Sequence, residues 1–323
     1  MFGAGAYAIW GVFPLYLTLL SDAGALEVLA HRIAWSLVFV TIVLSFRPVP
    51  GRWRALSQRP RALLLLSFGS VLIAVNWGVF IWLALNHNVL EASLGYFVNP
   101  LVTVLLGVLI LGEQLNRLQW TALSISALAV VVLTVDYGRP PIGAFALALS
   151  FGCYGLVKKK ANVRAAEGLA VETAVLFPLA LGYLIWLQLG GEALFGQAGW
   201  SNVLAFVGVG LATATPLLLF AGAATRVPLS VLGPLQYIGP ILQFFIGVFL
   251  LSEPMPASRL AGFTLVWVAL AIFSWDHVRR LRKLDRAGTD TEQQSSRPRD
   301  VRIEIEDGER TSQHPDQNGR TIR

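Results

Sequence analysis

The chain has 323 residues, of which 55% are hydrophobic and 14% charged, with a formal net charge of +6 and a mean hydropathy of +0.63. This composition lies outside the range of soluble globular proteins and indicates an integral membrane protein. A basic chain can also indicate nucleic-acid binding, but here the positive charges lie between long apolar stretches, so that class is excluded.

Ten mostly apolar stretches follow one another, each about the length that a helix needs to cross a bilayer. They are 2–20, 26–46, 62–85, 91–111, 118–136, 142–157, 169–189, 202–222, 229–251 and 258–276. Transmembrane strands would be about ten residues long and would alternate apolar with polar residues, which excludes a barrel. The sequence therefore predicts an all-α integral membrane protein with ten transmembrane helices.

The Lys and Arg residues between these stretches are distributed unevenly. They gather in the connections at 47–61 and 158–167 and in the segment after 276, whereas the connections on the opposite side carry none or one. Positive charges beside helix ends are retained on the cytoplasmic side of a membrane. We therefore expect both termini to be cytoplasmic.

Residues 277–323 are polar and include no aromatic residue. Such a composition predicts a disordered cytoplasmic tail. Its first turn, from Arg279 to Lys283, is expected to lie at anionic lipid headgroups.

The chain contains an internal repeat. Residues 96–113, YFVNPLVTVLLGVLILGE, align without gaps with residues 236–253, QYIGPILQFFIGVFLLSE, at an offset of 140. Near the start the offset becomes 141, where WGVF (10–13) meets FGCY (151–154). A repeat of this length indicates that the protein is built from two similar units.

The repeat divides the membrane region into two five-helix halves, 1–136 and 142–276. Because five is an odd number, the second half enters the membrane from the opposite side. Inverted halves of this kind are typical of secondary transporters, in which exchanging the roles of the halves exposes one site alternately to each side.

Several long segments carry a family resemblance, among them AYAIWGVFPLY, NHNVLEASLGYFVNPL and LSVLGPLQYIGPILQF. With these segments, the region from 1 to 276 resembles the RarD-like permeases of the drug/metabolite transporter superfamily, whose repeat unit is called EamA. The resemblance implies a ten-helix permease of the bacterial inner membrane. The long polar tail departs from that pattern.

Polar residues recur on one face of the fourth helix of each half. Tyr96, Asn99 and Thr103 share a helical face, and the repeat places Gln236, beside Tyr237, and Gln243 on the equivalent face. Pro100 and Pro240 interrupt both helices, which in transporters indicates a midplane binding site. A polar seam between closely packed helices is the alternative. Asn76 joins the candidate lining.

Two ionisable residues inside predicted helices occupy equivalent positions, Arg32 and Glu172. One interpretation makes them gates, each pairing to close its own side of the membrane. In the other, Arg32 snorkels to outer water, Glu27 pairs with His31 at i, i+4, and Glu172 stays near cytoplasmic water.

The end of the sixth helix and two aromatic residues complete the candidate site. Among three consecutive lysines, Lys158 is the candidate to face a cavity, following Tyr154 by one turn. Trp10 offers an aromatic wall for a ring or a cation, and interfacial anchoring is its alternative role.

Further acidic and polar residues lie at helix ends. Asn86, His87 and Asn88 form a connection or an outer vestibule, and Glu91 in the following first turn favours the helix dipole. Glu113 and Glu253 end equivalent helices, where capping of the next helix is preferred over proton coupling as an interpretation.

These features favour a secondary-active permease for a small-molecule solute, either a polar, amino-acid-like metabolite or a drug. No nucleotide-binding loop or cofactor motif is present, so proton coupling or exchange is the expected driving force. A passive channel is the second interpretation, and a membrane enzyme is the third. The scattered histidines, His31, His87, His277 and His314, indicate neither a catalytic cluster nor a metal site.

Overall fold

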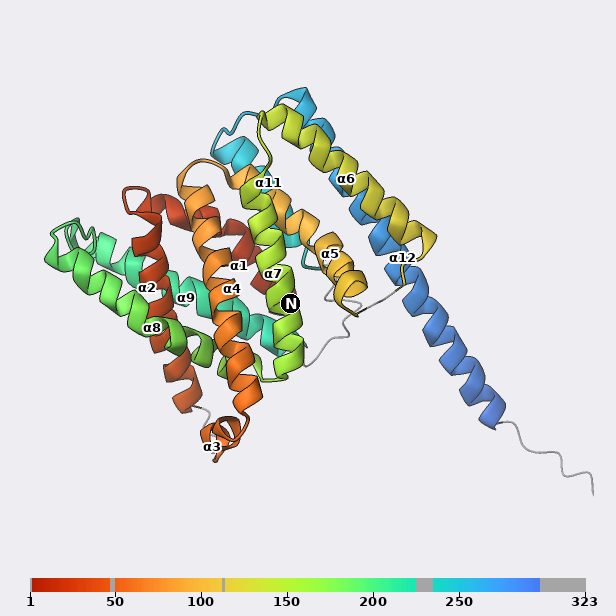
Figure 1. Ribbon diagram of the computed structural model, residues 1–323, viewed down its shortest axis with the longest axis horizontal. Helices are drawn as coiled ribbons and strands as arrows, with labels where there is room; N and C mark the ends of the chain where they lie inside the picture. Colours follow the sequence, from red (N-terminus) through yellow and green to blue (C-terminus); the bar gives the residue numbers. More distant parts are fainter. Residues whose placement is uncertain (1, 47–49, 112–113, 225–234, 297–323) are drawn as a thin grey trace, which may run out of the picture. The chain divides into compact units, whose positions relative to one another are not determined.

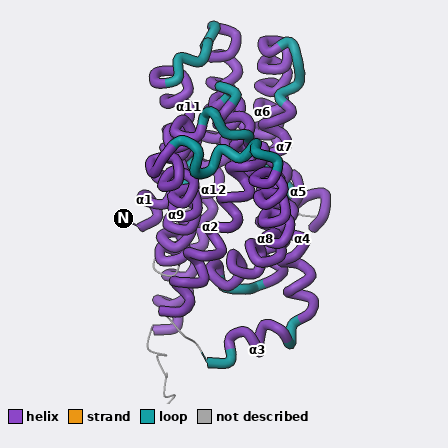
Figure 2. The backbone as a smooth tube through the Cα atoms, turned by 90° about the vertical axis from the view of Figure 1, so that its left-hand side faces the viewer, coloured by secondary structure: helices purple, strands orange, loops and turns teal. Residues whose placement is uncertain are grey.

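The computed structural model describes residues 2–46, 50–111, 114–224 and 235–296. These residues form helices joined by loops, with no strand in the described ranges (Figure 2). Nine of the described helices are long and apolar enough to cross a membrane, and a shorter apolar helix spans Ile238–Leu250. The predicted all-α membrane fold is thereby confirmed, and the first part of the predicted helix at 229–251 lies outside the described residues.

The helices follow the predicted order closely. The first half holds α1 (Phe2–Leu17), the short η1 (Thr18–Leu20), α2 (Ala25–Phe46), the short α3 (Arg52–Ser57), α4 (Pro60–Leu85), α5 (Val89–Leu111) and α6 (Arg117–Tyr137). The second half holds α7 (Ile142–Ala161), α8 (Ala165–Leu189), α9 (Gly199–Ala224), α11 (Ile238–Phe245), the π-helical η2 (Ile246–Leu250) and α12 (Ala257–Ser296).

The two halves pack through reciprocal contacts (Figure 1). Helix α1 packs against α9 and α11, and the equivalent helix α7 packs against α4 and α5. Glycine allows α5 and α7 to approach closely, because a Cβ at Gly95 would lie 2.8 Å from the carbonyl oxygen of Ala144. The first helix of each half is therefore held by the third and fourth helices of the other.

The last helices of the halves, α6 and α12, lie side by side, and hydrogen bonds join them at both ends of α6. Their apolar faces share one buried cluster that includes Ala129, Leu133 and Phe263. Asp136 accepts hydrogen bonds from the Ser258 hydroxyl and from Arg259 Nε, the latter at 2.8 Å. At the other end of the pair, Asp276 accepts from Asn116 Nδ2 at 2.8 Å. Asp136 and Asp276 occupy equivalent positions of the repeat.

Two buried carboxylates cap helices that lie far from them in the sequence. Glu253 accepts hydrogen bonds from the amides of Val89, at 2.5 Å, and Leu90, at 2.9 Å, at the start of α5. Burial raises the pKa of the Glu253 carboxyl, although the two amide donors act in the opposite direction. The capping role predicted for Glu253 is found, but the capped helix is α5 and not the next helix along the chain. Glu113 lies outside the described residues.

Glu91 has the same role at the start of α7. Its carboxylate accepts from the Gly143 amide at 2.8 Å and from Arg139 at 2.9 Å. A Cβ at residue 143 would lie 2.8 Å from Glu91 Oε1, so the contact requires glycine there. The predicted first-turn carboxylate thus stabilises a helix of the other half in addition to its own.

The C-terminal segment begins with more helix than the composition indicates. The chain divides into two units, 1–279 and 280–323, and α12 continues to Ser296, although disorder is predicted from residue 277. Residues 277–286, HVRRLRKLDR, include many strong helix formers, which explains the continuation. Residues 297–323 lie outside the described ranges.

We expect Glu253→Ala to destabilise the protein by about 1–2 kcal/mol, because two buried amides lose their acceptor. Thermal unfolding in detergent measures the change, with Glu192→Ala at an exposed position as the control. Equal melting temperatures for the two variants would contradict the capping role.

Candidate functional site

A buried hydrogen-bond network joins the two halves near the middle of α4. Asn76 Nδ2 donates to the carbonyl oxygen of Leu147 and to Ser150 Oγ, both at 3.1 Å and both on α7. The Tyr96 hydroxyl of α5 donates to Asn76 Oδ1 at 3.3 Å. Only 1% of Asn76 is exposed, so its amide is satisfied entirely within the protein. This network connects three helices that belong to both halves.

Arg32 on α2 lies close to this network as a buried cation. Its guanidinium carbon lies 4.4 Å from the ring centroid of Trp77 and 4.8 Å from that of Phe13. Among the described residues, Nε and Nη1 have no hydrogen-bond partner. The alternative in which Arg32 snorkels to water is wrong, because only 4% of the residue is exposed.

Glu172 on α8 is buried as well, but it is fully partnered. Its carboxylate accepts from Lys158 Nζ and from the Tyr154 hydroxyl, each at 2.9 Å. The expectation that Glu172 stays near cytoplasmic water is wrong, since 1% of the residue is exposed. Both partners belong to α7, so the ion pair lies within the second half.

A chain of aromatic rings runs between the two buried charges. Phe13, which contacts Arg32, lies 6.0 Å from Phe80, and Phe80 lies 5.8 Å from Tyr96. Tyr96 lies 6.3 Å from Phe151, which in turn lies 6.2 Å from Tyr154 beside Glu172. The rings form an apolar connection between Arg32 and the Lys158–Glu172 pair. At Tyr96, in the middle of the series, the hydroxyl bonds to Asn76.

A model of the EamA-like transporter family matches residues 1–135. Protein RarD of Streptomyces exfoliatus is 50% identical over 283 residues, which are 88% of this chain and 90% of that protein. The chain belongs to the EamA-like transporter family. RarD of Escherichia coli K12 is 42% identical, covering 86% of this chain and 94% of its own. An uncharacterized transporter of Bacillus subtilis, YojE, is 45% identical with the same coverage.

A solved protein structure also superposes on this EamA permease. Its TM-score is 0.55 at 18% sequence identity, covering 84% of this chain and 95% of the other. At that identity the likeness concerns the fold alone. The relatives and the apolar helices identify a multi-pass bacterial membrane transporter of the RarD type.

The predicted polar stripes are the faces formed by Tyr96, Asn99 and Thr103 and by Gln236, Tyr237 and Gln243. Their residues lie in different surroundings. Gln243 Nε2 donates to the Trp10 carbonyl oxygen at 3.2 Å, which brings these two candidates together between α1 and α11. Thr103 is exposed and donates to the Asn99 carbonyl oxygen at 2.9 Å, while Asn99 Oδ1 is buried without a partner in the described ranges.

The start of α11 carries two more of the candidate residues. Tyr237 packs against the buried cluster to which α5, α6 and α12 contribute. Gln236 is half-buried next to it. The roles proposed for the stripes in substrate binding remain predictions.

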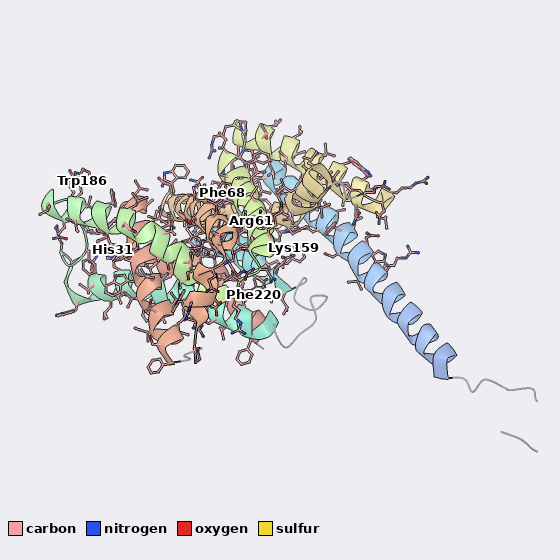
Figure 3. The ribbon with its side chains drawn as sticks, turned by 60° about the horizontal axis from the view of Figure 1, so that its bottom comes forward. His31, Arg61, Phe68, Lys159, Trp186 and Phe220 are labelled. Carbon is pink, nitrogen blue, oxygen red and sulfur yellow. The ribbon has the colours of Figure 1, made fainter. Side chains whose placement is uncertain are left out.

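The predicted pairing of Glu27 with His31 is not formed. Glu27 Oε1 instead accepts from the Leu194 amide at 2.8 Å and from the Phe195 amide at 3.0 Å, in the connection between α8 and α9. The His31 ring, labelled in Figure 3, lies 4.6 Å from each of the rings of Phe195 and Phe206. A carboxylate that reaches across the halves therefore replaces the local ion pair.

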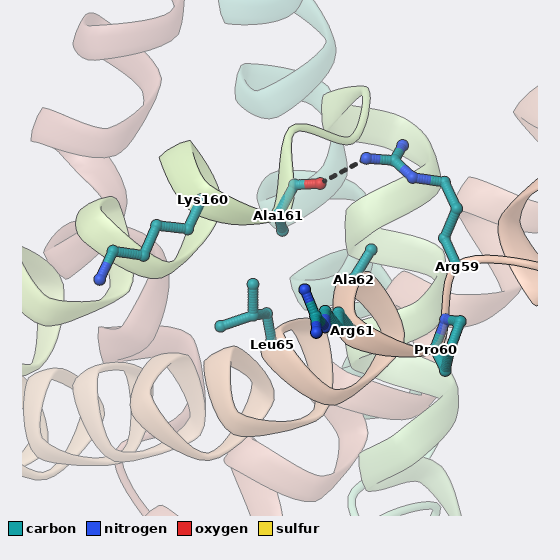
Figure 4. A pocket seen from close by; sticks show the side chains of 7 residues that line it. All are labelled: Arg59, Pro60, Arg61, Ala62, Leu65, Lys160 and Ala161. Atoms are coloured by element: carbon teal, nitrogen blue, oxygen red, sulfur yellow. Dashed lines mark hydrogen bonds between the residues drawn. The ribbon is translucent and has the colours of Figure 1, made fainter.

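Lys158 differs from its two neighbours in the basic end of α7. It turns inward to Glu172, whereas Lys159 and Lys160 are exposed. Lys160 lines an open pocket of about 400 Å³ with Arg59 and Arg61, seen in Figure 4. Arg59 there donates to the carbonyl oxygens of Ala161, at 3.3 Å, and Asn162, at 3.4 Å. This pocket holds none of the candidate residues.

Sequence patterns missed Phe13, Phe80 and Ser150. Ser150 carries the hydroxyl that accepts from Asn76, and the two phenylalanines connect Arg32 with Tyr96. A signal was present for Phe13, because the repeat at offset 141 pairs it with the candidate Tyr154. None was present for Ser150, which lies in an apolar run.

We expect Lys158→Met to destabilise this permease by about 2–3 kcal/mol, because Glu172 keeps only the Tyr154 hydroxyl as a donor. Adding Glu172→Gln is expected to restore most of the loss, since no buried charge then remains unpaired. Denaturant unfolding in detergent measures both changes, with Lys159→Met as the control. A Lys158→Met variant as stable as the control would rule out the pair as a structural element.

Proposed function

We propose that this protein is a secondary-active permease that moves a small polar metabolite across the bacterial inner membrane by alternating access. Its solute site lies between the halves at Asn76 and Tyr96. The observation that carries the proposal is the buried network in which Asn76 bonds to Tyr96 of the first half and to Ser150 of the second. A site shared by both halves changes its exposure when one half rocks against the other.

The reciprocal packing of the halves supports alternating access. Because α1 packs on α9 and α11 as α7 packs on α4 and α5, exchanging the two arrangements yields a second conformation from the same contacts. Burial of Arg32, Asn76 and Glu172 in the described structure is compatible with an occluded or one-sided state. Lys158, paired with Glu172, forms a charge pair that proton binding would break, which supports proton coupling.

The contacts between connections support the proposed orientation. Arg52 lies 3.2 Å from Glu167, and Arg59 bonds to residues 161 and 162, so the two basic connections meet at one end. Glu253 meets the start of α5 at the opposite end, where the connections carry few cations. The first of these ends is cytoplasmic in the proposal, in accordance with the positive-inside rule.

Cysteine labelling tests this orientation. Cys153 is the single cysteine, so Cys153→Ala gives a cysteine-free background for Ser57→Cys and Glu192→Cys, both at exposed positions. In intact cells a membrane-impermeant maleimide is expected to label residue 192 alone, and in sealed inside-out vesicles residue 57 alone. The reverse pattern in intact cells would invert the proposed topology.

Counterflow in proteoliposomes tests the transport activity. Vesicles are loaded with amino acids, small organic acids or lipophilic drugs, and exchange of the external labelled solute is followed. We expect saturable exchange of a polar metabolite, reduced at least about tenfold by Asn76→Ala through loss of its three hydrogen bonds. Tyr96→Phe, which removes one hydroxyl, is expected to have a smaller effect.

The Asn99→Ala, Gln236→Ala double variant separates the two candidate regions. Unchanged exchange in that variant, together with loss in Asn76→Ala, would place the site at the Asn76 network and not along the predicted stripes. Exchange of drugs alone would favour a broad drug exporter, and flux without saturation would favour a channel.

A further inference from the structure

Arg32 is a buried cation whose charge no described carboxylate balances. The described ion pairs occupy Glu91, Asp136, Glu167 and Glu172 with other cations, and Glu27 accepts from two backbone amides. The rings of Phe13 and Trp77 attract the guanidinium but accept no conventional hydrogen bond from Nε or Nη1. A desolvated charge of this kind is strongly unfavourable unless an anion approaches it.

The second half shows how the same position is balanced by the protein itself. Glu172 is the repeat equivalent of Arg32, and Tyr154, which bonds to Glu172, is the equivalent of Phe13. One turn further along, Lys158 supplies the opposite charge. Its equivalent in the first half is Leu17, which is apolar and 1% exposed. The first half therefore repeats the arrangement without its counter-ion.

The geometry points to Arg32 as the binding site for the carboxylate of the transported solute. This role differs from the gating role predicted for Arg32 from the sequence. This inference rests on the proposed transport function and names its substrate class: a small organic acid, either a monocarboxylate or an amino acid. Nε and Nη1 of the guanidinium are buried donors without a partner in the described residues, and a carboxylate is the anion that accepts charge-assisted hydrogen bonds from a guanidinium most readily.

Charge balance favours a carboxylate over a phosphate ester. Arg32 offers one positive charge, and Lys158, the other inward-facing cation of the described network, is already neutralised by Glu172. A single carboxylate balances the charge of Arg32 itself. A dianionic phosphate would leave a net negative charge among aromatic rings, which a desolvated environment disfavours.

The neighbouring rings define the remainder of the solute. Phe13 contacts the guanidinium, and Phe80 and Tyr96 continue from it at centroid distances of 6.0 and 5.8 Å. An apolar or aromatic group next to the carboxylate would lie against these rings, and the Asn76 amide with the Tyr96 hydroxyl would meet a polar substituent.

Matched acids and amides test the inference with purified full-length protein. The pairs are acetate with acetamide, phenylacetate with phenylacetamide, 3-phenylpropionate with its amide, and L-phenylalanine with L-phenylalaninamide. Each pair keeps its skeleton and changes only the carboxylate. Binding is measured by the ligand-dependent rise in melting temperature, which requires no transport. Wild-type protein is expected to bind at least one acid about tenfold more tightly than its amide.

Two substitutions at the site and one control identify the residue responsible. Arg32→Gln is expected to reduce the acid-to-amide affinity ratio to about one, and Arg32→Lys to retain part of it, since the charge remains but the planar fork is lost. Arg61→Gln removes an exposed cation at the basic end of the molecule and is expected to leave the ratio unchanged. An unchanged acid-to-amide affinity ratio in Arg61→Gln would exclude a general effect of net charge.

Several results would overturn the inference. They are equal stabilisation by acid and amide in the wild type, no stabilisation by any acid, and a preference for acids that persists in Arg32→Gln. If Arg32→Gln fails to fold, a preference in Arg32→Lys that is reduced below the wild-type ratio supports the inference, and a full wild-type ratio there overturns it.

Counterflow separates this inference from the proposed function. Binding of acids through Arg32 without exchange of any solute would support the site and contradict the permease. Saturable exchange of amides and acids at equal rates would support the permease and contradict the carboxylate site.

Discussion

Polar groups within a bilayer must find their partners inside the protein, and the two halves of this permease satisfy that constraint for each other. Glu253 of the second half accepts the first amides of α5, and Glu91 of the first half accepts an amide of α7. These bonds fix where the two helices begin. Because α5 carries Tyr96 and α7 carries Leu147 and Ser150, the same bonds position the three partners of Asn76. The candidate site therefore depends on caps that lie about two helical turns away along α5 and α7.

Helix positions could be predicted because hydrophobic length alone decides them. The predicted stretch 26–46 corresponds to α2 at Ala25–Phe46, and 118–136 to α6 at Arg117–Tyr137. Larger differences occur where charged residues extend a helix beyond the apolar run. Helix α7 continues from the predicted end at 157 to Ala161 because its three lysines suit a helix C-terminus. Hydropathy reports the bilayer core, whereas the helix itself continues into the interface.

Candidate residues could be predicted by type, but their partners could not. An isolated asparagine in an apolar helix indicates a polar role, and Asn76 has one, yet the sequence does not show which serine meets it. Local spacing suggested Glu27 with His31, whereas Glu27 accepts from Leu194 and Phe195, 167 and 168 residues away. Spacing along one helix describes a face, and only the packing between helices decides what that face meets. Tyr237 shows the limit most plainly, because it belongs to a predicted stripe and packs against the buried cluster of α5, α6 and α12.

The symmetry of the backbone and the asymmetry of its side chains have different consequences. If the halves were identical, the two conformations obtained by exchanging their roles would have equal free energy and neither side would be preferred. Arg32 and Glu172 break that equality, because one equivalent position carries an unbalanced cation and the other an anion neutralised by Lys158. The free energy of the Arg32 environment then changes with whatever anion enters it, while that of the Glu172 environment changes with the protonation of its pair. In the proposed permease, occupancy of the first and protonation of the second would therefore shift the same conformational equilibrium, which is the thermodynamic requirement for coupling a solute to an ion.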